Sequence, residues 1–388
     1  MFLILFWICL GLIAYTYVLF PILIIIRGWV WPRPYKSEEM KPLPLMSVII
    51  AAYNEEKSIG EKLENVFSLD YPHDRLEVVI ASDGSTDRTD EVIKNFEGSG
   101  IKLLSLPRQG KASALNAAVS ASNGEILVFS DANSIYKADA LRALIRPFAD
   151  PIVGGVAGNQ SYLKKIGKSS VGVGERSYWS FDRLMKESES KAGSTISATG
   201  AIYAIRRSLF QNVMEGVTDD FYTSTGVISQ GLRLVFAADA IAFEHPASTS
   251  KVEFGRKVRI ITRGLRAIFI ARSALLNPFR FGFYAIQLFS HKVLRRLIVF
   301  PLLLLFFVTP FLWTTHLFYK FMMLGQLAFY SLGALGLLLN GTRLGRLKIL
   351  TIPFYFCLVN AAVVVATVNI YQGRQIKRWE PQRDVEIP

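Results

Sequence analysis

Residues 47–54 read SVIIAAYN, and this stretch sets the fold because five apolar residues in a row lead directly into Tyr53 and Asn54. Runs of the same kind recur at 76–85 (LEVVIASDGS), 101–107 (IKLLSLP) and 125–134 (EILVFSDANS). A helical stretch follows each of the four runs, at residues 55–67, 87–96, 111–122 and 138–148. Strands that are apolar on both faces and alternate with helices predict βαβ units around a buried parallel sheet, an α/β fold.

The chain as a whole is too apolar for a purely soluble enzyme. Of its 388 residues 51% are hydrophobic, and its mean hydropathy is +0.31. Residues 2–26 carry no charged side chain and lack a small-residue cleavage site, so we expect a retained membrane anchor. Further apolar spans are expected at 297–313, 317–339 and 349–370. The membrane segments therefore lie at the two ends, and the chemistry is expected in the middle.

These observations predict five parts of the chain. They are an N-terminal transmembrane anchor (1–30), a catalytic α/β domain (36–250), basic amphipathic or interfacial helices (251–292), C-terminal transmembrane helices (293–373) and a basic tail (374–388).

The chain is basic, with 44 Lys and Arg against 31 Asp and Glu and a net charge of +13. This balance favours anionic lipid or phosphate-bearing partners. Because many cations flank the apolar segments, the positive-inside pattern explains them better than nucleic acid does. It predicts a multi-pass protein of the plasma (bacterial inner) membrane with a cytoplasmic catalytic domain. Four spans would place the basic tail outside, so either an additional re-entrant or spanning piece lies within 281–313, or the tail breaks the rule.

Polar side chains follow the predicted strands at the edge of the sheet where ligands bind. They are Tyr53, Asn54 and Glu55 after the first strand, Asp83 after the second, Lys111 after the third, and Asp131 and Asn133 after the fourth. Neither a P-loop nor a dinucleotide fingerprint fits, because position 105 is serine and the stretch after the first strand has no glycine. The edge is therefore expected to bind a phosphate-bearing ligand in another way.

Asp131 and Asn133 stand two residues apart and could share a divalent cation. The same residue types are equally typical of a turn. Asp83 has an alternative of the same kind, because the cluster at 85–87 could simply cap the following helix.

Beyond residue 150 the alternation of strands and helices loosens. TGAIYAIRR (199–207) is expected to be a strand that another molecule approaches closely at Gly200, and 217–246 a loop with two acids, a helix ending at Gly231 and a pair of strands. Asp219 and Asp220 could stabilise the start of that helix, or their proximity could raise one pKa and create a general base.

A stripe of arginines recurs at intervals of three or four within 251–276: Arg256, Arg259, Arg263 and Arg266. Three interpretations stay open, namely a solvated helix face, an interfacial helix on anionic lipid, and a clamp on a leaving diphosphate.

Taken in order, AAYNEE, SDGSTD, GKASALNAA, SDANS, TGAIYAIRR and TDDF resemble the motifs of the family 2 glycosyltransferases. The similarity is to the membrane-embedded branch containing cellulose, chitin, hyaluronan and poly-N-acetylglucosamine synthases. The resemblance covers residues 46–270. It implies a GT-A fold with a Rossmann-like mixed sheet, a nucleotide-diphosphate sugar donor, a divalent metal (Mg²⁺ or Mn²⁺) and inversion at the anomeric carbon.

The resemblance also implies roles for individual residues. Asp220 would deprotonate the acceptor hydroxyl, Asp131 and Asn133 would hold the metal, and Gly200 and Asp219 would lie on the acceptor side. The donor would be bound by Tyr53, Asn54, Glu55, Asp83, Lys111, Arg256 and Arg259.

The chain departs from the family pattern at two places. Asn133 replaces the second acid of the Asp-x-Asp motif, and Arg256 and Ile260 replace the Gln and Trp of the Gln-x-x-Arg-Trp motif, of which only Arg259 is kept. The expected function is transfer from a UDP-sugar to a growing β-linked polysaccharide. The alternatives are a single addition to a lipid-linked acceptor and a non-catalytic transport or assembly subunit.

Overall fold

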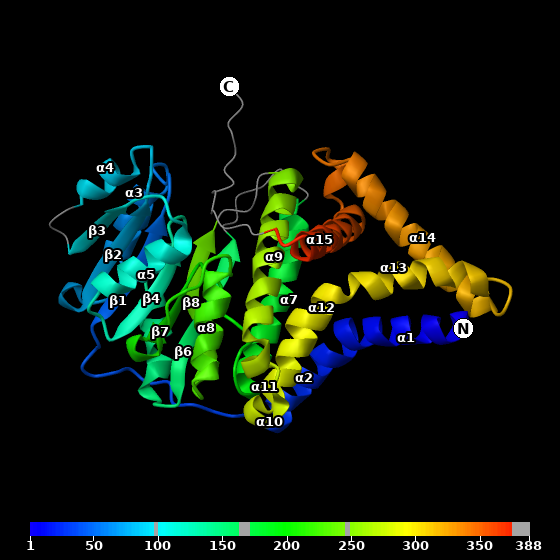
Figure 1. Cartoon of the computed structure of the whole chain (residues 1–388), viewed down its shortest axis with the longest axis horizontal. Helices are drawn as coiled ribbons and strands as arrows, with labels where there is room; N and C mark the ends of the chain where they lie inside the picture. Colours follow the sequence, from blue (N-terminus) through cyan, green and yellow to red (C-terminus); the bar gives the residue numbers. More distant parts are fainter. Residues whose placement is uncertain (97–99, 163–170, 245–248, 375–388) are drawn as a thin grey trace.

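The computed structural model describes residues 1–96, 100–162, 171–244 and 249–374. A sheet with its covering helices forms one end of the molecule, and the apolar helices of both termini form the other (Figure 1). The helices α7 (Val171–Ala192) and α9 (Ser250–Leu275) stand between the two parts.

The sheet has eight strands in the order β3-β2-β1-β4-β7-β6-β8-β5. Their bounds are β1 Met46–Ala52, β2 Leu76–Asp83, β3 Ile101–Leu106, β4 Ile126–Asp131, β5 Ile135–Tyr136, β6 Val153–Tyr162, β7 Tyr203–Arg206 and β8 Arg233–Glu244. The first four strands to be predicted are present and mutually parallel, whereas β7 runs antiparallel to both β4 and β6. The sheet is therefore mixed, as the resemblance implies.

Both faces of β1 are buried because helices cover both sides of the sheet. Val48 and Ile50 belong to a core that includes the helix α3 (Ile59–Phe67) and the helix α6 (Ala140–Ile145). Ile49 and Ala51, which alternate with them, pack against the helix α5 (Lys111–Ala121). The short helix α4 (Thr89–Lys94) follows β2. This two-sided burial is the physical reason for the unbroken apolar runs in the sequence.

The strand register sets the carboxyl ends of β1, β2 and β4 at one level. Ala51 pairs with Asp131, and Ala52 pairs with Ser82, the neighbour of Asp83. The polar groups at these ends are therefore brought to a single edge of the sheet.

Two expectations for the second half of the domain are wrong in detail. The strand expected at 199–207 begins only at Tyr203, so Gly200 precedes it. The expected pair of strands after the helix α8 (Asp219–Ser229) is one strand, β8. The register of β8 against β6 shifts between the pairs Ala157–Phe236 and Asn159–Ile241. The strand β8 therefore bulges between these two pairs.

Within the described residues, three helical segments are long and apolar enough to cross a membrane. They are Phe2–Val30, which comprises α1 (Phe2–Ala14) and α2 (Phe20–Val30), α14 (Leu317–Leu338) and α15 (Lys348–Tyr371). The span expected at 297–313 is instead the second half of a pair, Phe283–Leu297 with Val299–Leu312, that is bent by 49°. The short helix α10 (Pro278–Phe281) precedes this pair. The pair itself contains α11 (Phe283–Leu288), α12 (Arg295–Leu297) and α13 (Val299–Val308).

The bent pair bears on the alternative that the sequence left open. The apolar composition and the bend of this helix pair agree with a re-entrant or broken span within 281–313. Nearly all of the basic tail, from residue 375 on, lies outside the described residues.

Candidate active site

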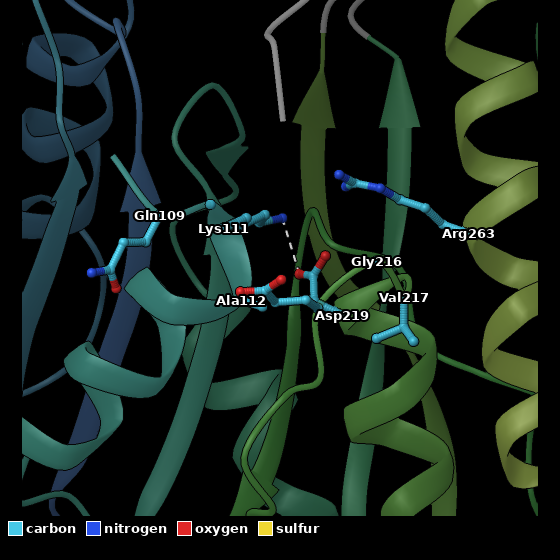
Figure 2. Close-up of a pocket in the computed structure, with 9 residues that line it drawn as sticks. Gln109, Lys111, Ala112, Gly216, Val217, Asp219 and Arg263 are labelled. Carbon is cyan, nitrogen blue, oxygen red and sulfur yellow. Dashed lines mark ion pairs between the residues drawn. The ribbon is translucent and has the colours of Figure 1, made fainter. Parts of the chain in front are cut away.

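A lysine joins two carboxylates at the polar edge of the sheet. The Nζ of Lys111 lies 2.8 Å from Oδ1 of Asp131 and 3.0 Å from Oδ2 of Asp219. Lys111 opens α5, Asp131 ends β4 and Asp219 opens α8, so three separate elements meet here. Figure 2 shows Lys111 meeting Asp219 while Arg263 reaches toward them from α9.

The position of Lys111 depends on Asp83. The carboxylate of Asp83 is buried and accepts the backbone N–H groups of Gln109 at 2.7 Å and Gly110 at 2.9 Å, and it pairs with the guanidinium of Arg108. Gly110 has φ +108°, a conformation that favours glycine and starts α5 abruptly at Lys111. Asp83 thus fixes the loop that presents Lys111, and its direct contact with a nucleotide stays a prediction.

The residues that follow β1 are tied to the loop after β2. Asn54 has φ +53° and its Oδ1 accepts the N–H of Thr86 at 2.7 Å, while Glu55 is buried and donates its own N–H to Oγ1 of Thr89 at 2.7 Å. The guanidinium carbon Cζ of Arg108 lies over the ring of Tyr53, 3.4 Å from the ring centroid. These three residues shape the edge of the sheet, and their contact with a donor stays a prediction.

The capping alternative for the 85–87 cluster is supported as well. Oδ1 of Asp87 accepts the N–H of Thr89, the first residue of α4, at 3.0 Å. Asp87 therefore stabilises the start of α4, whereas Asp83 stabilises the loop before Lys111.

Asp220 stands next to the Lys111 cluster and is half-buried. Burial, followed by the negative charge of Asp219, raises the pKa of Asp220 to about 6, although Lys111 acts in the opposite direction. Burial alone would lower the pKa of Lys111, but the carboxylates of Asp131 and Asp219 raise it, so Lys111 stays cationic. A carboxylate with this pKa is ionised at neutral pH and basic enough to accept a proton.

Two arginines of α9 face the acidic cluster. Burial, with the nearby charges of Arg263 and Arg256, lowers the pKa of Arg259 to about 10, while Asp131 and Asp219 act to raise it. Arg263 lines a pocket together with Lys111, Asp219 and Glu215. Both arginines remain charged at neutral pH and supply positive charge beside the carboxylates.

Arg256 points to a different place. Its Nη2 lies 2.8 Å from Glu253, a fully buried carboxylate that also accepts the hydroxyl of Tyr355 on α15 at 3.3 Å. Of the two arginines expected to bind the donor, Arg259 therefore faces the cluster and Arg256 faces the apolar helices. Arg263, which the sequence placed only within the stripe, joins the pocket.

The turn after β4 combines both of its sequence interpretations. The N–H of Ser134 donates to the carbonyl of Asp131 at 3.3 Å, which closes a turn with Asn133 exposed at its tip. Oδ1 of Asp131 is occupied by Lys111. A Cβ added to Gly200 would lie 2.7 Å from Oδ2 of Asp131, so the close approach expected at Gly200 is made by Asp131 of the same chain. A contact of Gly200 with an acceptor stays a prediction.

The donor set fits a divalent metal only with help from a ligand. Among the described residues no group of three or more His, Cys, Asp or Glu side chains converges as a metal site. Mg²⁺ is commonly held by one or two carboxylates together with substrate phosphates. Asp131 with the amide oxygen of Asn133 fits that arrangement, in which a bound diphosphate would complete the coordination.

Comparisons with known proteins agree with this geometry. Residues 47–214 match the sequence model of the family described as Glycosyl transferase family 2. The chain is 31% identical over 180 residues to a poly-beta-1,6-N-acetyl-D-glucosamine synthase of Staphylococcus epidermidis, covering 45% of this chain and 42% of that protein. It is 35% identical over 130 residues to a beta-monoglucosyldiacylglycerol synthase of Nostoc sp., covering 32% of this chain and 28% of that protein. The matches span between 25% and 56% of the length of these and other curated relatives.

A solved structure resembles nearly the whole chain. It is a mannosyltransferase from Pyrobaculum calidifontis in complex with GDP-Man and Mn²⁺, with a TM-score of 0.73 and 23% sequence identity, covering 96% of this chain and 100% of that one. The likeness establishes the fold, which is GT-A with apolar helices at both ends of the chain.

Proposed function

We propose that the chain is a member of glycosyl transferase family 2, whose sequence model residues 47–214 match, and that it transfers a sugar from a UDP-sugar to a growing β-linked polysaccharide. The observation that carries the proposal is the half-buried Asp220, with its raised pKa, beside the Lys111-bridged carboxylates of Asp131 and Asp219. This arrangement supports a role for Asp220 as a base beside cationic groups that would receive the leaving group.

In the proposed reaction Asp220 accepts the proton of an acceptor hydroxyl. The hydroxyl oxygen forms a bond to the anomeric carbon as the bond from that carbon to the diphosphate oxygen breaks. The diphosphate leaves with the electron pair, and attack from the opposite face inverts the anomeric configuration. One base and one displacement account for every proton and bond.

The leaving diphosphate needs positive charge, and several groups of this chain supply it. Lys111, Arg259 and Arg263 surround the position beside Asp131. A divalent metal held by Asp131 and Asn133 would add Lewis-acid stabilisation of the same oxygens. Lys111 would exchange its present carboxylate partners for phosphate when the donor binds.

A lipid-linked acceptor receiving one sugar is the second candidate. Ile260 occupies the position of the tryptophan found in polymerising members, and it is 39% exposed on α9, where it offers no aromatic platform for a glycan. The relative from Nostoc is named for a glucosylated lipid, which is consistent with an acceptor of this class in the family.

The proposed setting is the plasma membrane, with the sheet domain in the cytoplasm where nucleotide sugars are made. The candidate spans at both ends and the basic residues beside them support this orientation. Anionic lipid is the expected partner of the basic residues outside the site.

The proposal is tested with purified protein in lipid nanodiscs and a panel of radiolabelled UDP-sugars with Mg²⁺ or Mn²⁺. Transfer is expected from one of the UDP-sugars in the panel. Asp220→Asn should abolish this transfer while UDP binding stays intact. Asp74→Asn, which changes a carboxylate with 81% exposure, is the matched control. Retained turnover in Asp220→Asn would refute the assignment of the base.

Product length separates the candidate acceptors. A ladder of long chains supports the polysaccharide, and a single added sugar on extracted lipid supports the second candidate. The non-catalytic alternative predicts that no UDP-sugar is hydrolysed or transferred at any metal concentration, so turnover of any donor in the panel refutes it.

A further inference from the structure

Lys62 is a charged side chain enclosed by the apolar core of the sheet domain. It lies on α3, it is 0% exposed, and its neighbours Ile59, Leu63 and Val66 are core residues. Burying an ammonium group is costly unless polar partners compensate it. The cation therefore requires partners that an apolar residue at this position would not need.

Those partners lie immediately behind the candidate metal turn. The Nζ of Lys62 donates to the carbonyl oxygen of Ser134 at 2.6 Å, and it lies 3.6 Å from the ring centroid of Tyr136. Ser134 is the residue that closes the turn on Asp131. The lysine thus holds the last peptide group of the turn that presents Asp131 and Asn133.

A second side chain of α3 grips the same segment. Asn65, one helical turn after Lys62, donates to the carbonyl of Tyr136 at 2.9 Å and accepts the N–H of Tyr136 at 2.7 Å. Because residues three apart lie on one helix face, both side chains act on residues 134–136 from the same direction.

The opposite side of Ser134 is held by a buried acid. Oγ of Ser134 donates to Oε1 of Glu244 at 3.1 Å, and Gln160 donates to Oε2 of Glu244 at 2.6 Å. Burial lowers the pKa of Lys62 to about 7, while the charges of Asp131 and Glu244 act in the opposite direction. Ser134 is therefore held between the buried Lys62 of α3 and the buried Glu244 at the end of β8.

We propose that Lys62 is a positioning residue that holds the Asp131–Ser134 turn in the conformation in which Asp131 and Asn133 bind the divalent metal of the donor complex. The inference rests on the proposed function, because it assigns that turn to the metal. A lysine with a merely structural role would affect the stability of the fold and leave metal affinity unchanged.

The test measures Mn²⁺ binding by electron paramagnetic resonance in the presence of UDP, using the full chain in nanodiscs. Lys62→Met keeps most of the aliphatic stem and removes the ammonium. It should weaken Mn²⁺ binding about tenfold, the size of effect found when a group that orients a metal ligand is removed. UDP binding measured in EDTA should be unchanged. Lys94→Met, an exposed lysine on α4, is the matched control and should bind Mn²⁺ like the unmodified protein.

Three outcomes are distinguishable. Equal Mn²⁺ affinity in Lys62→Met and the unmodified protein overturns the inference. If the unmodified protein binds neither UDP nor Mn²⁺, the proposed function itself fails. Should Lys62→Met not fold, Lys62→Gln replaces it, since its side chain is polar but uncharged and ends one bond short of the contact with the Ser134 carbonyl; weakened Mn²⁺ binding there supports the inference and full affinity refutes it.

Discussion

The pH dependence of transfer should report the pKa of Asp220. Burial and the charge of Asp219 raise this pKa from 3.8 to about 6. The base must be ionised to act, so the rate should be on its plateau above pH 7 and fall as the pH drops through 6. A pKa near 6 makes the rate at pH 7 about tenfold higher than the rate at pH 5.

Two substitutions should move this acidic limb in opposite directions. Asp219→Asn removes a negative charge that raises the pKa of Asp220, so the limb should move to lower pH. Lys111→Met removes a positive charge that lowers the same pKa, so the limb should move to higher pH. With a change of about one pH unit in each, the pH 7 to pH 5 rate ratio becomes about 2 for Asp219→Asn and about 50 for Lys111→Met.

The assay is the initial rate of sugar transfer at saturating donor, acceptor and Mn²⁺. The pH is varied from about 4.5 to about 8.5, a range that covers the acidic limb and the plateau. Both variants are expected to be slower than the unmodified protein, so the position of the limb is compared and not its height. Asp74→Asn should leave the position unchanged. A limb that moves in the same direction in both variants, or stays fixed in both, would refute the assignment of Asp220 as the titrating base.

Three further predictions follow from the same geometry. Asn133→Asp adds a carboxylate at the tip of the turn and should tighten Mn²⁺ binding in the presence of UDP about tenfold; unchanged affinity in a Mn²⁺ titration would contradict a ligand role for this position. Gly200→Ala places a Cβ 2.7 Å from Oδ2 of Asp131 and should reduce both Mn²⁺ binding and transfer at least about tenfold, whereas Gly193→Ala, where nothing lies within 4 Å, should be silent in both assays. Arg263→Met should weaken UDP binding in calorimetry, while Arg256→Met, which leaves the buried Glu253 with Lys257 as its remaining ion-pair partner, should mainly lower the thermal unfolding temperature; the reverse pattern would be inconsistent with the pocket.

The first half of the sheet could be predicted from sequence because its strands are buried on both faces. β6 could not, since its sequence VGGVAGNQSY offers few apolar side chains. The structure supplies them from elsewhere: at Gly154 and Gly158 the side chains of Leu209, Val227 and Ile202 occupy the space that a Cβ would need. A strand shows no apolar pattern in its own sequence where side chains of neighbouring elements cover its faces.

The site could be predicted only as a set of residue types. The sequence predicts Lys111 and Asp131 at one edge of the sheet and Asp219 at the start of a later helix, but it does not reveal that one ammonium joins both acids. The arginine stripe was predicted on one helix face, yet the placement of α9 decides that Arg263 faces the pocket and Arg256 faces α15. Lys62 left a signal in the sequence, since it lies three residues after Ile59 on the apolar face of an amphipathic helix, where a lysine is out of place.

The helix α9 joins the chemistry of the sheet domain to the bilayer. One end of the stripe is bound through Glu253 to Tyr355 of α15, and two turns later Arg263 lines the pocket beside Asp219. A sheet domain cut free before Ser250 would keep its carboxylates and lose one wall of its own binding site. The apolar helices are in this sense part of the scaffold of the candidate site, and we expect lipid composition or detergent to alter catalysis without any change in the residues of the sheet domain.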